Sequence, residues 1–121
     1  LDRLGSPHID PGEAFLFAAA ADSYDSVVVT GDKRACRALA GLGVSELHGK
    51  VLCLESCLLL LLRSVDFHFL VDSLAIVREY HQTLRVVLSQ GASTLEVDFR
   101  TGVESYWRDL LAETGDLLWR P

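Results

Sequence analysis

The stretch that decides the fold is DPGEAFLFAAAADSYDSVVVTGDKRACRALAGLGV, which runs from Asp10 to Val44. Its first part predicts a helix that continues to about Ala21. Asp10 can cap the amino end, Pro11 suits the first helical position, and Glu13 lies three residues after the cap, as a capping box requires. The helix is apolar on nearly every side, which favours a buried position.

The second part of the stretch predicts a parallel sheet. The β-branched run Val27–Thr30 shows no alternation, which is typical of a strand covered on both faces. Between Asp32 and Leu42 the apolar residues recur at the spacing of a helix, and the apolar run Val51–Leu54 comes after them. A strand, a crossover helix and a strand form a right-handed parallel unit. We therefore expect an α/β fold of three layers, α/β/α, in which helices cover both faces of the sheet.

Beyond Ser64 the pattern becomes mainly helical. Asp72 can cap a helix over residues 73–89, and a last amphipathic helix is expected around residues 103–111. Between them Leu95, Val97 and Phe99 alternate with polar residues, which predicts a short edge strand. The C-terminal part is therefore expected to be a helical extension.

Composition sets the limits of this organisation. The chain has 121 residues, enough for one domain with a core, and we divide it into an α/β part, residues 1–64, and a helical part, residues 65–121, that packs on it. A net charge of −6 excludes binding of nucleic acid through overall charge. The longest apolar run falls short of the roughly 20 residues of a spanning helix, so no membrane is expected. Three cysteines without a C-x-x-C pair suit the reducing cytoplasm.

Matched lengths of helix and strand predict where the acidic residues lie. The helix from Glu13 to Asp22 covers roughly 14 Å, and the return from Ser26 to Gly31 covers roughly 16 Å. Glu13 and Asp32 should therefore lie at the same edge of the sheet. This is the carboxyl edge, where open α/β sheets bind their ligands. Glu55 follows the next strand directly and is expected at the same edge.

Two interpretations of these acids remain open. Carboxylates gathered at one edge suit Mg²⁺ or Mn²⁺, which can activate water for hydrolysis of a phosphodiester. Alternatively, Glu13 only completes a capping box and Asp32 only caps the next helix. The basic residues Lys33, Arg34 and Arg37 either contact a phosphate backbone or form a solvated helix face.

The stretch from Asp10 to Val44 resembles the late segment of PIN-like domains, a family of metal-dependent ribonucleases. In that family an acidic residue opens a helix, and the following strand ends in a Thr-x-Asp-type turn with a Lys or Arg nearby. The run GKVLCLESCLLLL, from Gly49, resembles the last strand and helix of bacterial members. By position, Glu13 matches the later helix-start acid and Asp32 matches the acid after the fourth strand. The resemblance implies a ribonuclease with RNA as substrate and Mg²⁺ or Mn²⁺ as cofactor.

The sequence departs from the family in one respect. The first-strand Asp and the middle acid of PIN-like domains would lie upstream of Glu13, which only twelve residues precede here. We therefore expect a partial domain with part of the acidic site. A catalytically inactive PIN-like module that binds another protein is the alternative.

Thr30–Lys33 is also similar to a motif of haloacid-dehalogenase-like P-type pumps, whose Asp-Lys-Thr-Gly-type run is missing. Exposed strand edges in a partial domain predict association into a homo-oligomer.

Overall fold

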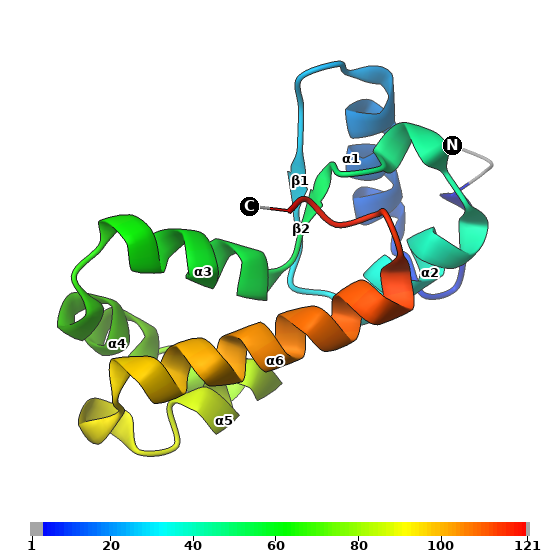
Figure 1. Ribbon diagram of the computed structural model, residues 1–121. Helices are drawn as coiled ribbons and strands as arrows, with labels where there is room; N and C mark the ends of the chain where they lie inside the picture. The colour runs from blue at the N-terminus through cyan, green and yellow to red at the C-terminus, as the bar shows by residue number, and fades with distance from the viewer. Residues whose placement is uncertain (1–3, 121) are drawn as a thin grey trace. The chain divides into compact units, whose positions relative to one another are not determined.

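The computed structural model describes residues 4–120 and is mostly helical, with 66% helix and 4% strand. In chain order the elements are α1 (Pro11–Asp22), β1 (Val28–Val29), α2 (Lys33–Leu42), η2 (Ser45–Leu47), β2 (Val51–Leu52), α3 (Leu54–Ser64), α4 (Phe67–Ala75), η3 (Arg78–Tyr80), α5 (Gln82–Val87), η4 (Gly91–Ser93) and α6 (Glu96–Thr114) (Figure 1).

The chain forms two compact units. The first unit comprises Leu1–Leu54 together with Asp109–Pro121, and the second unit comprises Glu55–Arg108. These boundaries differ from a division after residue 64, because α3 belongs almost wholly to the second unit and the end of the chain belongs to the first.

The prediction of a three-layer α/β/α fold is wrong. Among the described residues the sheet has only two strands, and the rest of the regular structure is helical. The predicted direction of the strands is correct, because β1 and β2 are parallel with Val28 opposite Val51. A crossover helix fixes the direction of two strands, but it does not fix how many further strands join them.

Local caps set the bounds of α1 and α2. Asp10 Oδ1 accepts a hydrogen bond from Glu13 N at 2.9 Å, and Glu13 Oε1 accepts one from Asp10 N at 3.4 Å, which completes the predicted capping box. Asp32 caps α2, since its Oδ1 accepts from Ala35 N at 3.1 Å. Gly43 ends α2 with φ of 64°, a conformation that favours glycine.

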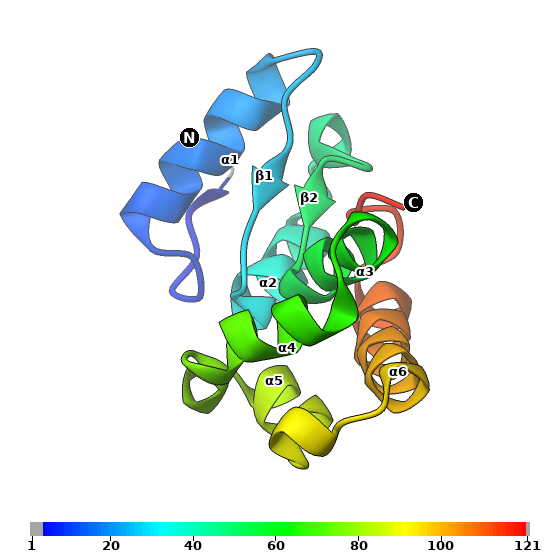
Figure 2. The same ribbon diagram turned by 90° about the vertical axis from the view of Figure 1, so that its left-hand side faces the viewer.

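The sheet of the first unit is covered on one face of β1 only. Val28 is buried, whereas Val27 and Val29 are 52% and 61% exposed, so the prediction of a strand buried on both faces is wrong. Leu118 extends the sheet beyond the other edge of β2 through an isolated bridge to Val51. β1 is therefore the edge strand, and Figure 2 shows it between β2 and α1.

Large apolar side chains fill the core of the first unit around β2. The fully buried ones are Phe17, Leu39, Leu47, Val51, Leu110 and Leu118. The Lys50 amine donates to Ala20 O at 2.8 Å and to Ser23 O, which holds the carboxyl end of α1 beside the start of β2.

The second unit replaces one predicted helix by several short elements. Residues 73–89 form the end of α4, the turn η3 and the helix α5 rather than a continuous helix. Asp66, not Asp72, caps α4, because its Oδ2 accepts from Phe69 N at 3.1 Å. His81 caps α5 through a bond from Thr83 N to Nδ1 at 3.2 Å.

The predicted edge strand of Leu95, Val97 and Phe99 is also wrong, because α6 begins at Glu96. Leu95 and Val97 are mostly exposed, whereas Phe99 is fully buried with its ring 5.6 Å from that of Phe67. Packing of the Phe99 ring inside the unit, together with the helical run that follows, overrides a three-residue alternation.

Gly102 of α6 lies against Val87 of α5. A Cβ added at Gly102 would lie 2.7 Å from Val87 Cγ1 and 3.7 Å from Val87 Cβ, so the branched side chain of Val87 or the backbone around it must shift. Gly41 of α2 offers the matched case, because a Cβ there would meet nothing within 4 Å.

We predict that Gly102→Ala destabilises the protein while Gly41→Ala does not. Overpacking costs about 1–3 kcal/mol, which outweighs the gain of about 0.5–1 kcal/mol that alanine brings to a helix. Gly41→Ala should keep that gain, reduced by its place near the end of α2. Urea denaturation of both variants measures the free energies of unfolding. Equal stabilisation by the two alanines would contradict the close approach of α5 and α6.

Candidate functional site

Glu13 and Asp32 lie together at the carboxyl end of β1, joined through Thr30. Thr30 Oγ1 donates to Glu13 Oε2 at 3.5 Å and accepts from Asp32 N at 3.1 Å. The structure thus brings these two predicted site residues to one place, at the end of the strand where their positions were expected.

Burial and neighbouring charge act on the Glu13 carboxyl. Its pKa lies above the ordinary value, chiefly because partial burial removes water from the charged form. The negative charges of Asp32 and Asp10 also raise the pKa, whereas the hydrogen bond from the Asp10 backbone lowers it. Glu13 and Asp32 are therefore close enough to interact electrostatically.

Capping accounts for the positions of both carboxylates. One oxygen of Glu13 and one of Asp32 accept hydrogen bonds from backbone N–H groups at the starts of α1 and α2. No group of three or more His, Cys, Asp or Glu side chains able to hold a metal occurs within residues 4–120. Two carboxylates do not form a closed cage for a resident ion.

Glu55, the third predicted ligand, lies in the second unit and is fully buried. Its Oε2 accepts a short hydrogen bond from Thr83 Oγ1, and Thr83 is also fully buried. A carboxylate enclosed in this way joins the start of α3 to α5 and presents no exposed oxygen to a ligand.

The three basic residues predicted to contact nucleic acid lie on α2. Arg34 Nη2 lies 3.0 Å from His8 Nδ1, and Arg37 forms an ion pair with Glu113. Both partners of that ion pair are about half exposed, so the pair contributes little to stability. Lys33 is half-buried. The guanidinium groups of Arg34 and Arg37 thus contact side chains of the same chain, His8 and Glu113.

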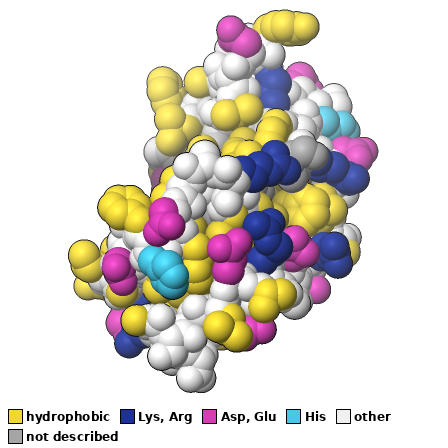
Figure 3. Space-filling view, turned by 60° about the vertical axis from the view of Figure 1, so that its left-hand side comes forward, with side chains coloured by type: hydrophobic (Ala, Val, Ile, Leu, Met, Phe, Trp, Pro, Cys, Tyr) yellow, Lys and Arg dark blue, Asp and Glu magenta, His cyan; other side chains and the backbone are white. Residues whose placement is uncertain are grey.

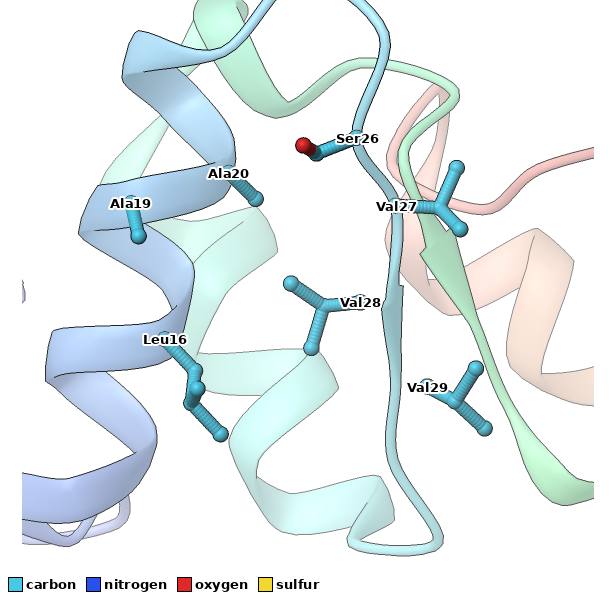
Figure 4. A pocket seen from close by; sticks show the side chains of 7 residues that line it. All are labelled: Leu16, Ala19, Ala20, Ser26, Val27, Val28 and Val29. Carbon is cyan, nitrogen blue, oxygen red and sulfur yellow. The ribbon is translucent and has the colours of Figure 1, made fainter.

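A pocket between α1 and β1 was not predicted from the sequence. The pocket has a volume of about 320 Å³ and is lined by Leu16, Ala19, Ala20, Ser26, Val27, Val28 and Val29. Figure 4 shows Ser26 and Val28 pointing toward α1, with Val27 and Val29 on the other side of the strand. Small alanine side chains on α1 leave the space open, which is the one signal in the sequence that could have indicated it.

The open edge of β1 borders this pocket. Val28 N donates to Lys50 O at 2.8 Å and Thr30 N donates to Leu52 O at 2.9 Å, so these amides face β2. Successive backbone amides of a strand point to opposite edges, and those of Val27 and Val29 therefore point away from the sheet. An edge strand of this kind is a template for pairing with another chain.

Apolar side chains of α1 and of the turn that follows it are also exposed, and one of them, Leu16, lines the pocket. Phe15, Leu16 and Tyr24 are 65%, 56% and 99% exposed. Figure 3 shows hydrophobic side chains scattered among acidic and basic ones over one face of the molecule. The exposed side chain of Leu16 therefore adjoins the unpaired strand edge.

Comparison with known proteins adds no relative. No protein-family model matches the sequence, and it matches neither a curated protein nor a solved structure. Within the described residues, no helix combines the length and the apolar character that crossing a membrane requires.

We predict that the Glu13 carboxyl makes a pH-dependent contribution to stability. Because its pKa is raised in the folded state, this contribution is complete below the ordinary value of 4.5 and is lost as the pH rises through the folded-state pKa. Glu13→Gln keeps the capping box but cannot ionise. Relative to the wild type, the variant should therefore gain stability between about pH 4 and about pH 7. Urea denaturation at both pH values measures the difference.

Asp32→Asn is the matched control, because asparagine still caps α2 while its charge is absent. In that background the pH-dependent effect of Glu13→Gln should become smaller. A difference between Glu13→Gln and wild type that does not change with pH would contradict the electrostatic interaction of the two acids.

Proposed function

We propose that the first unit is a protein-interaction module that binds an extended peptide segment beside β1. The observation that carries the proposal is the combination of an unpaired strand edge with an adjoining apolar pocket. This combination supports recognition by strand addition, in which main-chain hydrogen bonds give affinity and side-chain pockets give specificity.

The geometry of β1 supplies both parts of such recognition. The amides of Val27 and Val29 point away from β2 and are available as donors to an added strand. The pocket of about 320 Å³ beside Leu16 and Ala19 can receive apolar side chains of that strand. Covering the exposed Val27 and Val29 would remove further apolar surface from water, at roughly 25 cal/mol per Å².

We predict that Val29→Pro weakens peptide binding at least about tenfold while Val29→Ala retains most of it. Proline removes the outward N–H that an added strand needs, and it is tolerated at an edge because the N–H groups that face β2 belong to Val28 and Thr30. Alanine keeps the N–H and removes only side-chain contact. A displayed library of random heptapeptides should yield binders that lose at least about tenfold in affinity with Val29→Pro.

Urea denaturation of both variants checks that the fold is retained. Ile76→Ser, at an exposed position in the second unit, is a further control that should leave binding unchanged. Failure of the library to yield binders, or binders that tolerate Val29→Pro, would contradict strand addition at this edge.

A second candidate function is metal-dependent hydrolysis of RNA. It is favoured by one observation, the electrostatic proximity of Glu13 and Asp32 at the end of β1. Here the two carboxylates would hold Mg²⁺ or Mn²⁺ with the help of water and an RNA phosphate, and Lys33, Arg34 and Arg37 would contact the RNA backbone.

For this second function we predict weak binding of Mn²⁺ that depends on Asp32. Asp32→Asn keeps the cap of α2 but removes a charged ligand, and it should weaken Mn²⁺ binding by about tenfold or more. Electron paramagnetic resonance with and without a short single-stranded RNA measures the bound ion. Unchanged Mn²⁺ binding or unchanged RNA cleavage in Asp32→Asn would contradict a metal role for the pair.

A further inference from the structure

We infer that the segment bound beside β1 carries basic residues on both sides of a short core of β-branched residues. This inference rests on the proposed function and names the chemistry of its partner. It follows from the charges that surround the pocket and from the side chains that an added strand would meet.

All charged side chains of the segment that forms the pocket are acidic. Between Asp10 and Thr30 the chain has four carboxylates, those of Asp10, Glu13, Asp22 and Asp25, and no Lys, Arg or His. This segment builds α1, β1 and the turn between them. Within this segment, a partner that enters the pocket therefore meets only negatively charged side chains.

These acids do not line the pocket, but they lie near its lining residues in the chain, toward either end of α1. Asp22 and Asp25 lie at the turn between α1 and β1, and Ser23 Oγ donates to Asp25 Oδ1 at 3.4 Å. Glu13 lies at the opposite end, next to Thr30 and the exposed Asp32. Figure 2 shows α1 beside β1, and the lining residues run from Ala20 and Ser26, near the turn, to Leu16 and Val29.

The nearby cations offset only part of this negative charge. At the turn, the Lys50 amine, which donates to Ala20 O and Ser23 O, faces the two carboxylates of Asp22 and Asp25. At the other end, Lys33 and Arg34 follow Asp32 in the chain, where Asp10, Glu13 and Asp32 supply three carboxylates. Lysine or arginine on the partner would therefore add favourable charge contacts at both ends, and these would speed association and exclude acidic competitors.

The core of the partner segment is defined by its neighbours on each face. On the α1 side an added strand would meet Leu16 and Ala19, and on the other side it would lie next to the exposed Val27 and Val29. Both faces of the added strand would thus contact apolar side chains. β-Branched residues suit a pleated, half-buried surface of this kind.

The same charges argue against a second copy of this chain as the occupant. If two β1 edges paired, in either direction, the acids of one copy would approach the acids of the other at both ends. Like charges placed opposite each other across a strand pair are destabilising. The favoured occupant is consequently a segment of different charge.

The test uses fluorescence anisotropy with two labelled peptides that share the core Val-Thr-Val-Thr-Val. One peptide is flanked on each side by two lysines and the other by two glutamates. The lysine-flanked peptide should bind at least about tenfold more tightly at low salt, and the difference should shrink as added salt screens the charges. Asp22→Asn combined with Asp25→Asn should reduce the preference without preventing binding.

Each outcome separates this inference from the proposed function. Equal binding of the two peptides, with both lost in Val29→Pro, would overturn the charge inference and leave strand addition standing. Binding that tolerates Val29→Pro would overturn both, and failure of the lysine-flanked peptide to bind would overturn the inference. A dimer in sedimentation that Val29→Pro dissociates would assign the edge to a second copy and would also overturn it.

Discussion

The pairing of β1 with β2 is the constraint on which the first unit depends. Two backbone hydrogen bonds, from Val28 N to Lys50 O and from Thr30 N to Leu52 O, fix which amides of β1 face inward and which face outward. They also hold Thr30 where its hydroxyl lies between Glu13 and the backbone of Asp32. The open edge therefore follows from this short ladder, and the acid pair follows from the ladder together with the caps of α1 and α2. The ladder has only two residues per strand. A pair of strands this short depends on the packing of helices that precede and follow it in the chain, such as α1 and α2.

Features that depend on neighbouring residues could be predicted from the sequence. The capping box of Asp10 and Glu13, the cap at Asp32 and the left-handed glycine at Gly43 each involve residues within four positions of one another. The parallel direction of β1 and β2 follows from a crossover helix of fixed handedness. The proximity of Glu13 and Asp32 was predictable because the rise per residue of a helix and of a strand converts sequence length into distance.

Features that depend on distant parts of the chain could not be predicted. The run Val27–Thr30 lacks alternation, but the absence of a further strand leaves Val27 and Val29 exposed. The helical periodicity of residues 73–89 continues through breaks at η3, where packing in the second unit decides the path of the chain. Glu55 likewise follows a strand in the sequence, yet its bond to Thr83 of α5 is a long-range contact that no local pattern indicates.

The acids of the first unit are compatible with capping and with recognition together. A cap uses one carboxylate oxygen to accept from a backbone N–H and leaves the charge of the group intact. Asp32 remains exposed while it caps α2, and Asp22 and Asp25 are exposed at the turn before β1. Charged residues around an unpaired strand also act against unwanted pairing, which is how natural edge strands avoid aggregation. Asp10, Glu13 and Asp32 thus stabilise the starts of α1 and α2 and still leave negative charge beside β1. Charge around the edge is therefore one device by which an open strand can avoid pairing with identical copies.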